Sequence, residues 1–422
     1  MDRLRIQGGV PLKGVVPISG AKNAALPIMA ACLLTDAPLR LENVPHLTDI
    51  RALLRLLETL GVTSTMDGPA HRLTLSAHAL QQVLAPYDLV RKMRASILVL
   101  GPLVARHGKA KVSLPGGCAI GVRPVDLHLR GLEMLGASLS LEDGYICAEA
   151  PKGLVGGTVT FPVTTVTGTE NLLMAATLAR GTTTIVNAAL EPEVRDLATC
   201  LNAMGARITG LGTPTLTIEG VSALSGAKHT IIPDRIEAGT YALAAMATRG
   251  ALTLKAHALG TLLPSELPML IQMGAQITQE EESITVSAPE TLSACDITTE
   301  PFPGYPTDLQ AQGMAVLSLA QGSSIIRETI WENRFMHIAE FVRMGADISV
   351  HGLTAVVRGV PCLQGAPVMA TDLRASFGLI IAGLAAQGET MLHRLYHLDR
   401  GYEATEKKLS ACGACVERVR AS

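Results

Sequence analysis

The side chain best suited to chemistry lies in a glycine-rich run, Leu-Pro-Gly-Gly-Cys-Ala-Ile-Gly-Val-Arg, at residues 114–123. Its glycines let the backbone bend, and Pro115 and Pro124 separate it from neighbouring elements. The run therefore predicts a loop that presents Cys118, five residues before Arg123. A nearby cation favours the thiolate, which is a nucleophile or a tunable acid. The alternative is a tight turn that holds a small apolar cysteine.

Charged residues also recur at the starts of apolar segments. Positions 14 residues before six segment ends (36, 108, 181, 250, 322 and 388) hold Lys22, Arg94, Thr167, Ile236, Asp308 and Arg374. Helix N-termini present free N–H groups that bind phosphates and carboxylates, so these positions predict an anion site. Ordinary helix capping is the alternative. It suits Asp308 and Thr167, whereas a cation opposes the helix dipole.

Loops after the following strands add further reactive groups, namely Cys118, Arg123, Glu191, Arg334 and Arg400. Several cations with a carboxylate and a thiol indicate a multiply charged anionic substrate and group transfer with acid–base catalysis. The sequence has no Walker A motif, no GxGxxG that opens a helix after a strand, and no HExxH. ATP, a dinucleotide cofactor and a catalytic metal are therefore not indicated.

These groups belong to a repeated unit that ends in Gly-Ala or Gly-Val. The glycines are Gly61, Gly136, Gly205, Gly274, Gly345 and Gly413, at spacings of 75, 69, 69, 71 and 68 residues. Each stands where a helix C-cap needs a left-handed residue. Cys412 and Cys415 form a CxxC that could be a redox or zinc half-site, but the repeat explains it as the end of the last such helix.

Each unit contains two strands, an Ala-rich helix, a further strand and an amphipathic helix. The Ala-rich helices are predicted at Ala24–Leu34, Ile97–Val104, Leu172–Ala179, Tyr241–Ala247, Met314–Ala320 and Leu379–Ala386. Helices that are apolar all round are buried, so we expect them inside and the strands outside. Three units make a domain of ordinary size, which predicts an α/β protein of two similar domains.

Bulk composition excludes several classes of protein. The 422 residues include 48% hydrophobic and 3% aromatic residues, with a formal net charge of −2. Such a chain lacks the basic field and stacking platforms of nucleic-acid-binding proteins. The apolar run 24–34 is too short to span a bilayer, and eight scattered cysteines fit a reducing compartment. We therefore expect a soluble, cytoplasmic protein with no nucleic-acid or membrane partner.

Seven stretches resemble the UDP-N-acetylglucosamine 1-carboxyvinyltransferase family (the MurA type), within the EPSP synthase family. They are Gly-Ala-Lys-Asn-Ala-Ala-Leu-Pro at 20–27, the cysteine loop extended through 114–128, Phe161 to Asn171, Tyr-Pro-Thr-Asp-Leu-Gln at 305–310, Glu-Asn-Arg-Phe-Met-His at 332–337, Thr-Asp-Leu-Arg-Ala-Ser at 371–376 and Asp-Arg-Gly-Tyr at 399–402. The resemblance covers essentially the whole chain.

The resemblance implies two inside-out α/β barrels of three repeats each. It places residues 1–22 with 233–422 in a C-terminal catalytic domain, and 23–232 in an N-terminal domain that carries the Cys118 loop. The chain would cross between them near Lys22 and Pro233, which periodicity alone does not indicate.

The implied reaction moves the enolpyruvyl group of phosphoenolpyruvate to the 3′-hydroxyl of UDP-N-acetylglucosamine and releases phosphate by addition and elimination. This is the first committed step of peptidoglycan synthesis, and it needs no cofactor or metal. Cys118 would act as general acid and react with fosfomycin, and Asp308 would accept the sugar hydroxyl proton. By the same resemblance, Lys22, Arg123 and Arg400 would bind phosphoenolpyruvate, and Arg94 and Arg334 would support the anionic site. Asn23 and Asp308 would contact the sugar, and Asp372 and Arg374 would shape the site. The implied uridine contacts are Arg123, Pro124, Val125, Asp126, Leu127, Thr165, Val166, Thr167 and Ile330.

Three other interpretations remain at this point. The sister activity would transfer the enolpyruvyl group to shikimate 3-phosphate, although the cysteine loop and Gly-Ala-Lys-Asn at 20–23 favour the sugar nucleotide. A non-catalytic sensor of sugar nucleotides could lose the thiol freely, so an intact Cys118 opposes it. A purely structural repeat protein would leave cations at buried helix starts unexplained.

Overall fold

The computed structural model describes residues 2–115 and 125–420. Cys118, Arg123 and Pro124, which the sequence marks as site residues, lie outside the described residues. The described chain forms two compact units. Unit 1 contains residues 2–19 and 233–420, and unit 2 contains residues 20–115 and 125–232.

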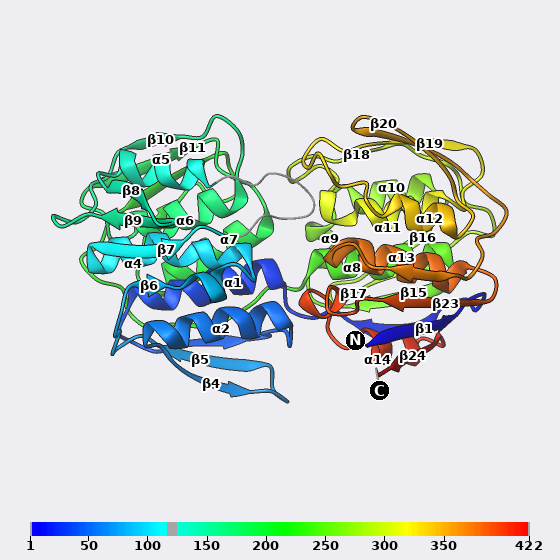
Figure 1. Cartoon of the computed structure of the whole chain (residues 1–422), viewed down its shortest axis with the longest axis horizontal. Helices are drawn as coiled ribbons and strands as arrows, with labels where there is room; N and C mark the ends of the chain where they lie inside the picture. The colour runs from blue at the N-terminus through cyan, green and yellow to red at the C-terminus, as the bar shows by residue number, and fades with distance from the viewer. Residues whose placement is uncertain (1, 116–124, 421–422) are drawn as a thin grey trace. The chain divides into compact units, whose positions relative to one another are not determined.

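Six four-stranded sheets organise the described residues, three in each unit (Figure 1). In unit 2 they are β14(Lys228–Thr230)-β3(Leu39–Glu42)-β5(Arg72–Ser76)-β4(Thr63–Asp67), β6(Leu84–Ala85)-β7(Lys109–Ser113)-β9(Tyr145–Glu149)-β8(Ser138–Glu142) and β10(Thr158–Thr160)-β11(Thr182–Val186)-β13(Thr215–Glu219)-β12(Arg207–Thr209). In unit 1 they are β2(Lys13–Pro17)-β15(Ala251–Lys255)-β17(Ser283–Ser287)-β16(Gln276–Gln279), β18(Ile297–Thr298)-β19(Ser323–Arg327)-β21(Thr354–Arg358)-β20(Asp347–His351) and β22(Pro367–Met369)-β23(Glu389–His393)-β1(Arg3–Gln7)-β24(Cys415–Val419).

All six sheets share one topology. Read in the order above, each begins with a parallel pair and continues with two antiparallel pairs. This shared order confirms the six repeats that the glycine spacing predicts. The N-terminal strand β1 lies between β23 and β24 of the last repeat, as the dark blue strand beside the red one in Figure 1.

The Ala-rich segments form buried helices, as their composition predicts. In unit 2 these are α1 (Lys22–Ala30) with the 3-10 turn η1 (Ala31–Leu34), η2 (Arg94–Val99) with α4 (Leu100–His107), and α6 (Val166–Ala176). In unit 1 they are α8 (Arg235–Ala247), η3 (Thr307–Leu309) with α11 (Gln310–Leu317), and α13 (Leu373–Ala385). Every residue of α8 and α11 is buried. Gly378 lets α13 approach α11 closely, because a Cβ there would lie 3.0 Å from the Ala311 carbonyl.

Amphipathic helices follow the buried ones and bury a single face. They are α2 (Thr48–Leu60), α5 (Asp126–Met134), α7 (Pro192–Ala203), α10 (Glu266–Gln272), α12 (Ile338–Arg343) and α14 (Thr405–Ala411); the short helices α3 (Tyr87–Val90), α9 (Leu259–Leu262) and η4 (Leu398–Arg400) lie in connections. All six repeat glycines just after these helices have positive φ, between 90° and 106°. The C-cap prediction is therefore confirmed at every repeat.

The helix N-caps bear on the capping alternative raised in the sequence analysis. Asp308 and Thr167 suit capping by residue type, but neither is an N-cap. Thr165 caps α6, Asp234 caps α8 and Asp372 caps α13, each by accepting backbone N–H groups of the first turn. Thr167 instead contacts His128, and Asp308 contacts Arg334 and Arg374.

The described first boundary between the units differs by three residues from the expected one. Lys22 is the first residue of α1, and the Ala21 N–H donates to the Ile232 carbonyl at 2.7 Å. Both α1 and this hydrogen bond lie within unit 2, so Gly20 to Lys22 belong with the helix they lead into.

Candidate active site

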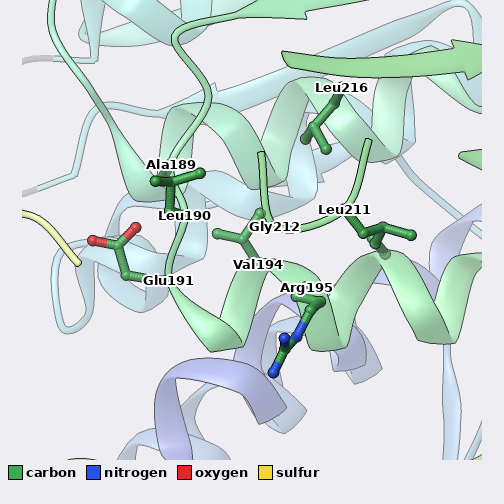
Figure 2. Close-up of a pocket in the computed structure, with 9 residues that line it drawn as sticks. Ala189, Leu190, Glu191, Val194, Arg195, Leu211, Gly212 and Leu216 are labelled. Atoms are coloured by element: carbon green, nitrogen blue, oxygen red, sulfur yellow. The ribbon is translucent and has the colours of Figure 1, made fainter. Parts of the chain in front are cut away.

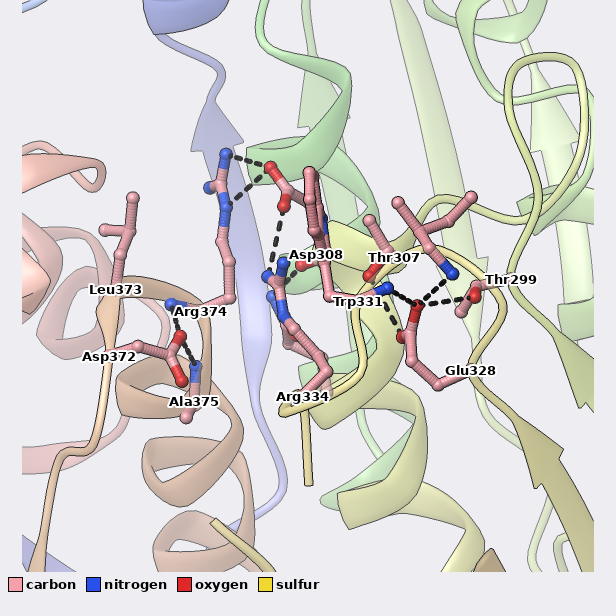
Figure 3. A network of polar contacts seen from close by, with 12 residues as sticks. Thr299, Thr307, Asp308, Glu328, Trp331, Arg334, Asp372, Leu373, Arg374 and Ala375 are labelled. Carbon is pink, nitrogen blue, oxygen red and sulfur yellow. Dashed lines mark hydrogen bonds and ion pairs between the residues drawn. The ribbon is translucent and has the colours of Figure 1, made fainter. Parts of the chain in front are cut away.

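Asp308 lies between two buried arginines in unit 1 (Figure 3). Arg334 donates from Nη2 to Asp308 Oδ1 at 3.1 Å. Arg374 reaches Asp308 Oδ2 from Nε at 3.0 Å and from Nη2 at 2.8 Å. The arginine side chains are 4% and 3% exposed, whereas that of Asp308 is 27% exposed. The two guanidiniums therefore hold a carboxylate that solvent, or a substrate, can reach.

Two guanidiniums face the single carboxylate of Asp308 in this cluster. Burial acts to lower the pKa of Arg374, but Asp308 opposes it, and the pKa is raised overall. Arg374 Nη1 is buried and has no hydrogen-bond partner among the described residues. A charged donor in a desolvated position is suited to a carboxylate or phosphate group.

Asp372 orients the helix that carries Arg374. Its Oδ1 accepts the Arg374 and Ala375 N–H groups at 2.8 and 3.0 Å, which fixes the start of α13. Burial acts to raise the pKa of Asp372, but Arg334 and the capped amides lower it overall. Asp372 therefore acts on the site through the helix end, consistent with the shaping role expected from the sequence.

The polypeptide around Asp308 is held from two sides. Gln312 on α11 donates from Nε2 to the Asp308 carbonyl at 3.0 Å and to the Tyr402 hydroxyl at 2.9 Å. Thr307 donates from Oγ1 to Glu328 Oε2 at 2.9 Å. Sequence reasoning missed Glu328 and Gln312. The signal for Glu328 was a carboxylate directly after the strand-like run 323–327, in the loop that also carries Arg334.

Lys22 is the first residue of α1 in unit 2 and is only 7% exposed. Its Nζ lies 3.3 Å from Asp49 Oδ2, and Asp49 stands in the first turn of α2. The sequence did not single out Asp49, because an acidic residue in the first turn of a helix is explained by its favourable interaction with the helix dipole. The ion pair compensates the charge of this buried ammonium.

His128 joins the two helix starts that carry the expected uridine contacts. Its Nε2 lies 3.2 Å from Thr167 Oγ1, and its Nδ1 lies 3.0 Å from Asn171 Nδ2. Asn171 Oδ1 accepts the Gly101 N–H at 2.6 Å, so its nitrogen is the donor toward the histidine. The imidazole therefore accepts at Nδ1 and donates from Nε2 to Thr167. Burial and Arg94 lower the pKa of His128 to about 3, which keeps the ring neutral.

The remaining expected residues are distributed over both units. In unit 2, Asn23 follows Lys22 on α1, Arg94 opens η2, Val125 precedes α5, Asp126 and Leu127 begin it, and Thr165 and Val166 start α6. In unit 1, Ile330 donates its N–H to Glu328 at 3.0 Å, and Arg400 ends η4. The structure thus brings Asp308, Arg334 and Arg374 together in one unit, and joins 126–128 to 165–171 in the other.

A pocket elsewhere in unit 2 is separate from these groups (Figure 2). It lies between α7 and the turn before β13 and is lined by Ala189, Leu190, Glu191, Val194, Arg195, Ala198, Leu211, Gly212 and Leu216. Of the charged residues that the sequence suggests for an anion site, Glu191 alone lines it. The remainder of its lining is largely apolar, so we do not assign the anion site to this pocket.

Comparison with known proteins places the chain in a family. The model of the family described as EPSP synthase (3-phosphoshikimate 1-carboxyvinyltransferase) matches residues 6–409. The chain belongs to this family of enolpyruvyl-transferring enzymes. The match extends into all six repeats of the chain.

Particular relatives are similar over their full length. Proteins named UDP-N-acetylglucosamine 1-carboxyvinyltransferase from Acidiphilium cryptum and Gluconacetobacter diazotrophicus are 59% and 58% identical to this chain, with 100% of each chain covered. Among solved structures, the enolpyruvyl transferase NikO from Streptomyces tendae has a TM-score of 0.90 and 28% identity, with 100% of this chain and 99% of that chain covered. EPSP synthase from Acinetobacter baumannii shares the fold, with a TM-score of 0.77 at 16% identity.

Proposed function

We propose that the chain transfers the enolpyruvyl group of phosphoenolpyruvate to the 3′-hydroxyl of UDP-N-acetylglucosamine, with release of phosphate. The observation that carries this proposal is full-length identity of 56–59% to relatives named for that activity. The reachable carboxylate of Asp308 between two arginines supports it. The reaction commits the sugar nucleotide to peptidoglycan synthesis, hence to cell-wall growth and division.

Asp308 has the place of the general base. In the addition step, its carboxylate accepts the proton of the sugar 3′-hydroxyl while the oxygen bonds to C2 of phosphoenolpyruvate. A proton from Cys118 adds to C3, which gives a tetrahedral phospho-ketal. Transfer of a C3 proton to the thiolate left on Cys118 and cleavage of the C2–O bond to phosphate then restore the double bond and release phosphate. Arg334 and Arg374 orient the carboxylate and offer positive charge to the anionic intermediate.

Binding of phosphoenolpyruvate is assigned to Lys22, Arg123 and Arg400, with Arg94 supporting the anionic site. Phosphoenolpyruvate carries a carboxylate and a phosphate, which match guanidinium and ammonium groups. Asn23 and Asp308 are assigned to the sugar. The uridine end is assigned to residues 123–127, residues 165–167 and Ile330; the hydrogen bond from His128 to Thr167 supports a joint role of the first two segments.

Phosphate release tests this function directly. We expect release from phosphoenolpyruvate only when UDP-N-acetylglucosamine is present. Release with shikimate 3-phosphate alone would instead assign the sister activity. Binding of the sugar nucleotide without release with either acceptor would identify a sensor.

The reactive thiol has a separate test. We expect the epoxide fosfomycin to alkylate Cys118, because a thiol beside anion-binding cations attacks a phosphonate epoxide readily. Intact-protein mass should rise by one fosfomycin in the presence of UDP-N-acetylglucosamine, and Cys118→Ser should abolish the increase. An unchanged wild-type mass would refute the role of this thiol.

The cysteines bear on the compartment. Seven cysteines of the described residues carry free thiols, which a reducing compartment maintains. None of the helices among these residues has the length and apolar character needed to cross a membrane. We place the reaction in the cytoplasm on the basis of the thiols and of the proposed substrates.

A further inference from the structure

Glu328 is a fully buried carboxylate with several hydrogen bonds of its own, drawn beside the Asp308 cluster in Figure 3. It stands directly after β19, between the segment that holds Asp308 and the segment that leads to Arg334. We propose that Glu328 is the positioning residue of this site and sets the geometry of the Asp308–Arg334 pair. The inference rests on the proposed function, in which Asp308 is the base.

The carboxylate accepts four hydrogen bonds. Oε1 accepts from Thr299 Oγ1 at 2.8 Å and from the N–H groups of Ile330 and Trp331 at 3.0 and 3.2 Å. Oε2 accepts from Thr307 Oγ1 at 2.9 Å. Three of these bonds fall on Oε1 and one on Oε2, and all four come from the protein. Glu328 therefore ties together the segments at Thr299, Thr307 and 330–331.

One arm of this arrangement reaches Asp308 through Thr307. Thr307 is the residue before Asp308 in η3, so a bond on its hydroxyl restrains the backbone that carries the base. Thr299 steadies the carboxylate from the opposite side, because its Oγ1 donates to Glu328 and accepts the Thr329 N–H at 2.9 Å.

The other arm reaches Arg334 through the turn at 330–331. Glu328 accepts the N–H groups two and three residues ahead of it, as a cap does at a helix start. The Arg334 N–H in turn donates to the Trp331 carbonyl at 3.4 Å. Arg334 also donates to Asp308 Oδ1 at 3.1 Å. The two chains of contacts that start at Glu328 therefore meet at the Asp308–Arg334 ion pair. Removal of Glu328 would loosen both members of the ion pair together.

Hydrogen exchange tests the positioning without any turnover. We expect the amides of Ile330 and Trp331 to exchange at least about tenfold faster in Glu328→Ala, since their acceptor is gone. Glu340→Gln is the matched control, because Glu340 is a buried carboxylate of the same unit that accepts the Met369 N–H at 3.2 Å. Exchange at 330–331 that stays unchanged in Glu328→Ala would overturn the proposal.

Kinetics test the consequence for the reaction. A displacement of about 1 Å can lower a rate about 100-fold, so we expect kcat for phosphate release to fall about 100-fold in Glu328→Ala. Glu328→Gln keeps one acceptor oxygen and should recover part of the loss. Thr307→Val breaks only the arm to Asp308 and should lower kcat more than it raises KM for UDP-N-acetylglucosamine.

The outcomes separate this inference from the proposed function. Wild-type kcat in Glu328→Gln and Thr307→Val, or a loss that matches only a smaller folded fraction by thermal unfolding, would refute the positioning role. If the wild-type protein released no phosphate while exchange at 330–331 responded to Glu328→Ala, the proposed function would fail and the structural role of Glu328 would stand.

Discussion

The side chains around Asp308 determine the orientation and exposure of its carboxylate. The same residue at a helix start could serve as a cap, but its carboxylate is turned to Arg334 and Arg374 instead. The arginines are almost fully buried and the carboxylate is not. A carboxylate placed in this way is oriented without being enclosed, which supports the proposed role of Asp308 in proton transfer from a bound hydroxyl.

Replacement of Asp308 should therefore affect chemistry more than folding. We expect Asp308→Asn to lower kcat for phosphate release about 10²- to 10⁴-fold, the range of general-base catalysis. Asp347→Asn is the control, because Asp347 makes an exposed ion pair with Arg358 at 3.3 Å. Equal kcat for Asp308→Asn and the control would argue against Asp308 as the base. Calorimetry with UDP-N-acetylglucosamine checks that the variant still binds substrate.

His128 gives a residue-scale prediction about pH. Its folded pKa is about 3, below the ordinary histidine value of 6.5, because of burial and Arg94. Between these values the unfolded chain takes up a proton that the folded chain does not. The stability contributed by the neutral ring is therefore complete above about pH 6.5 and is lost as pH falls toward 3.

The measurement is the free energy of unfolding from urea titrations at pH 4.5, 5.5 and 6.5. Wild type should lose up to about 1.4 kcal/mol more per pH unit than His128→Asn, which lacks the titrating ring. His351→Asn, at an exposed histidine, should follow the wild-type slope. Parallel slopes for wild type and His128→Asn would contradict the neutral, buried imidazole.

At the scale of elements, periodicity and capping chemistry account for most of what the sequence predicts. The apolar Ala-rich runs become buried helices because no face of them can be solvated well. The repeat glycines end the amphipathic helices because only glycine adopts positive φ at little cost. The N-caps were less predictable, since Asp234 and Asp372 lie outside the apolar runs that define the helices.

Gly136 isolates the energetic contribution of one C-cap. Its φ is 90°, and a Cβ there would meet nothing within 4 Å. Gly136→Ala should therefore lower the free energy of unfolding by about 1–2 kcal/mol through backbone strain alone. Gly157→Ala, directly before β10 and outside the positive-φ region, should change it by less than about 0.5 kcal/mol. Urea unfolding of both variants makes the comparison, and equal values would rule out the strain argument.

At the scale of the whole molecule, the chain ends meet in one sheet. β1 pairs with β24 in antiparallel register, with Arg3 opposite Val419. A linker of about six Gly and Ser residues should therefore join the ends without strain.

A circular permutant tests this placement of the ends. Opened between Asp143 and Gly144, an exposed hairpin turn of unit 2, it should keep the wild-type circular dichroism spectrum and phosphate release. A permutant opened between Met246 and Ala247, within the buried helix α8, should not fold. Failure of the first permutant would contradict the pairing of β1 with β24.

The sequence by itself determined the six repeats, their helices and strands, and the residue types of an anion-binding transferase. These follow from local patterns, because periodicity and C-cap glycines are properties of short segments. Local sequence patterns did not reveal Glu328, His128 or Asp49, because each acts through partners distant in sequence or through backbone amides.

Only the tertiary structure decided which strand completes which sheet. β2 precedes α1 but pairs with β15, whereas β14 precedes α8 but pairs with β3. The two strands are thus exchanged between the units, although both fit the same repeat pattern. Any strand of this repeat offers the same backbone donors and acceptors, so the choice depends on the packing of the whole chain and not on a local signal.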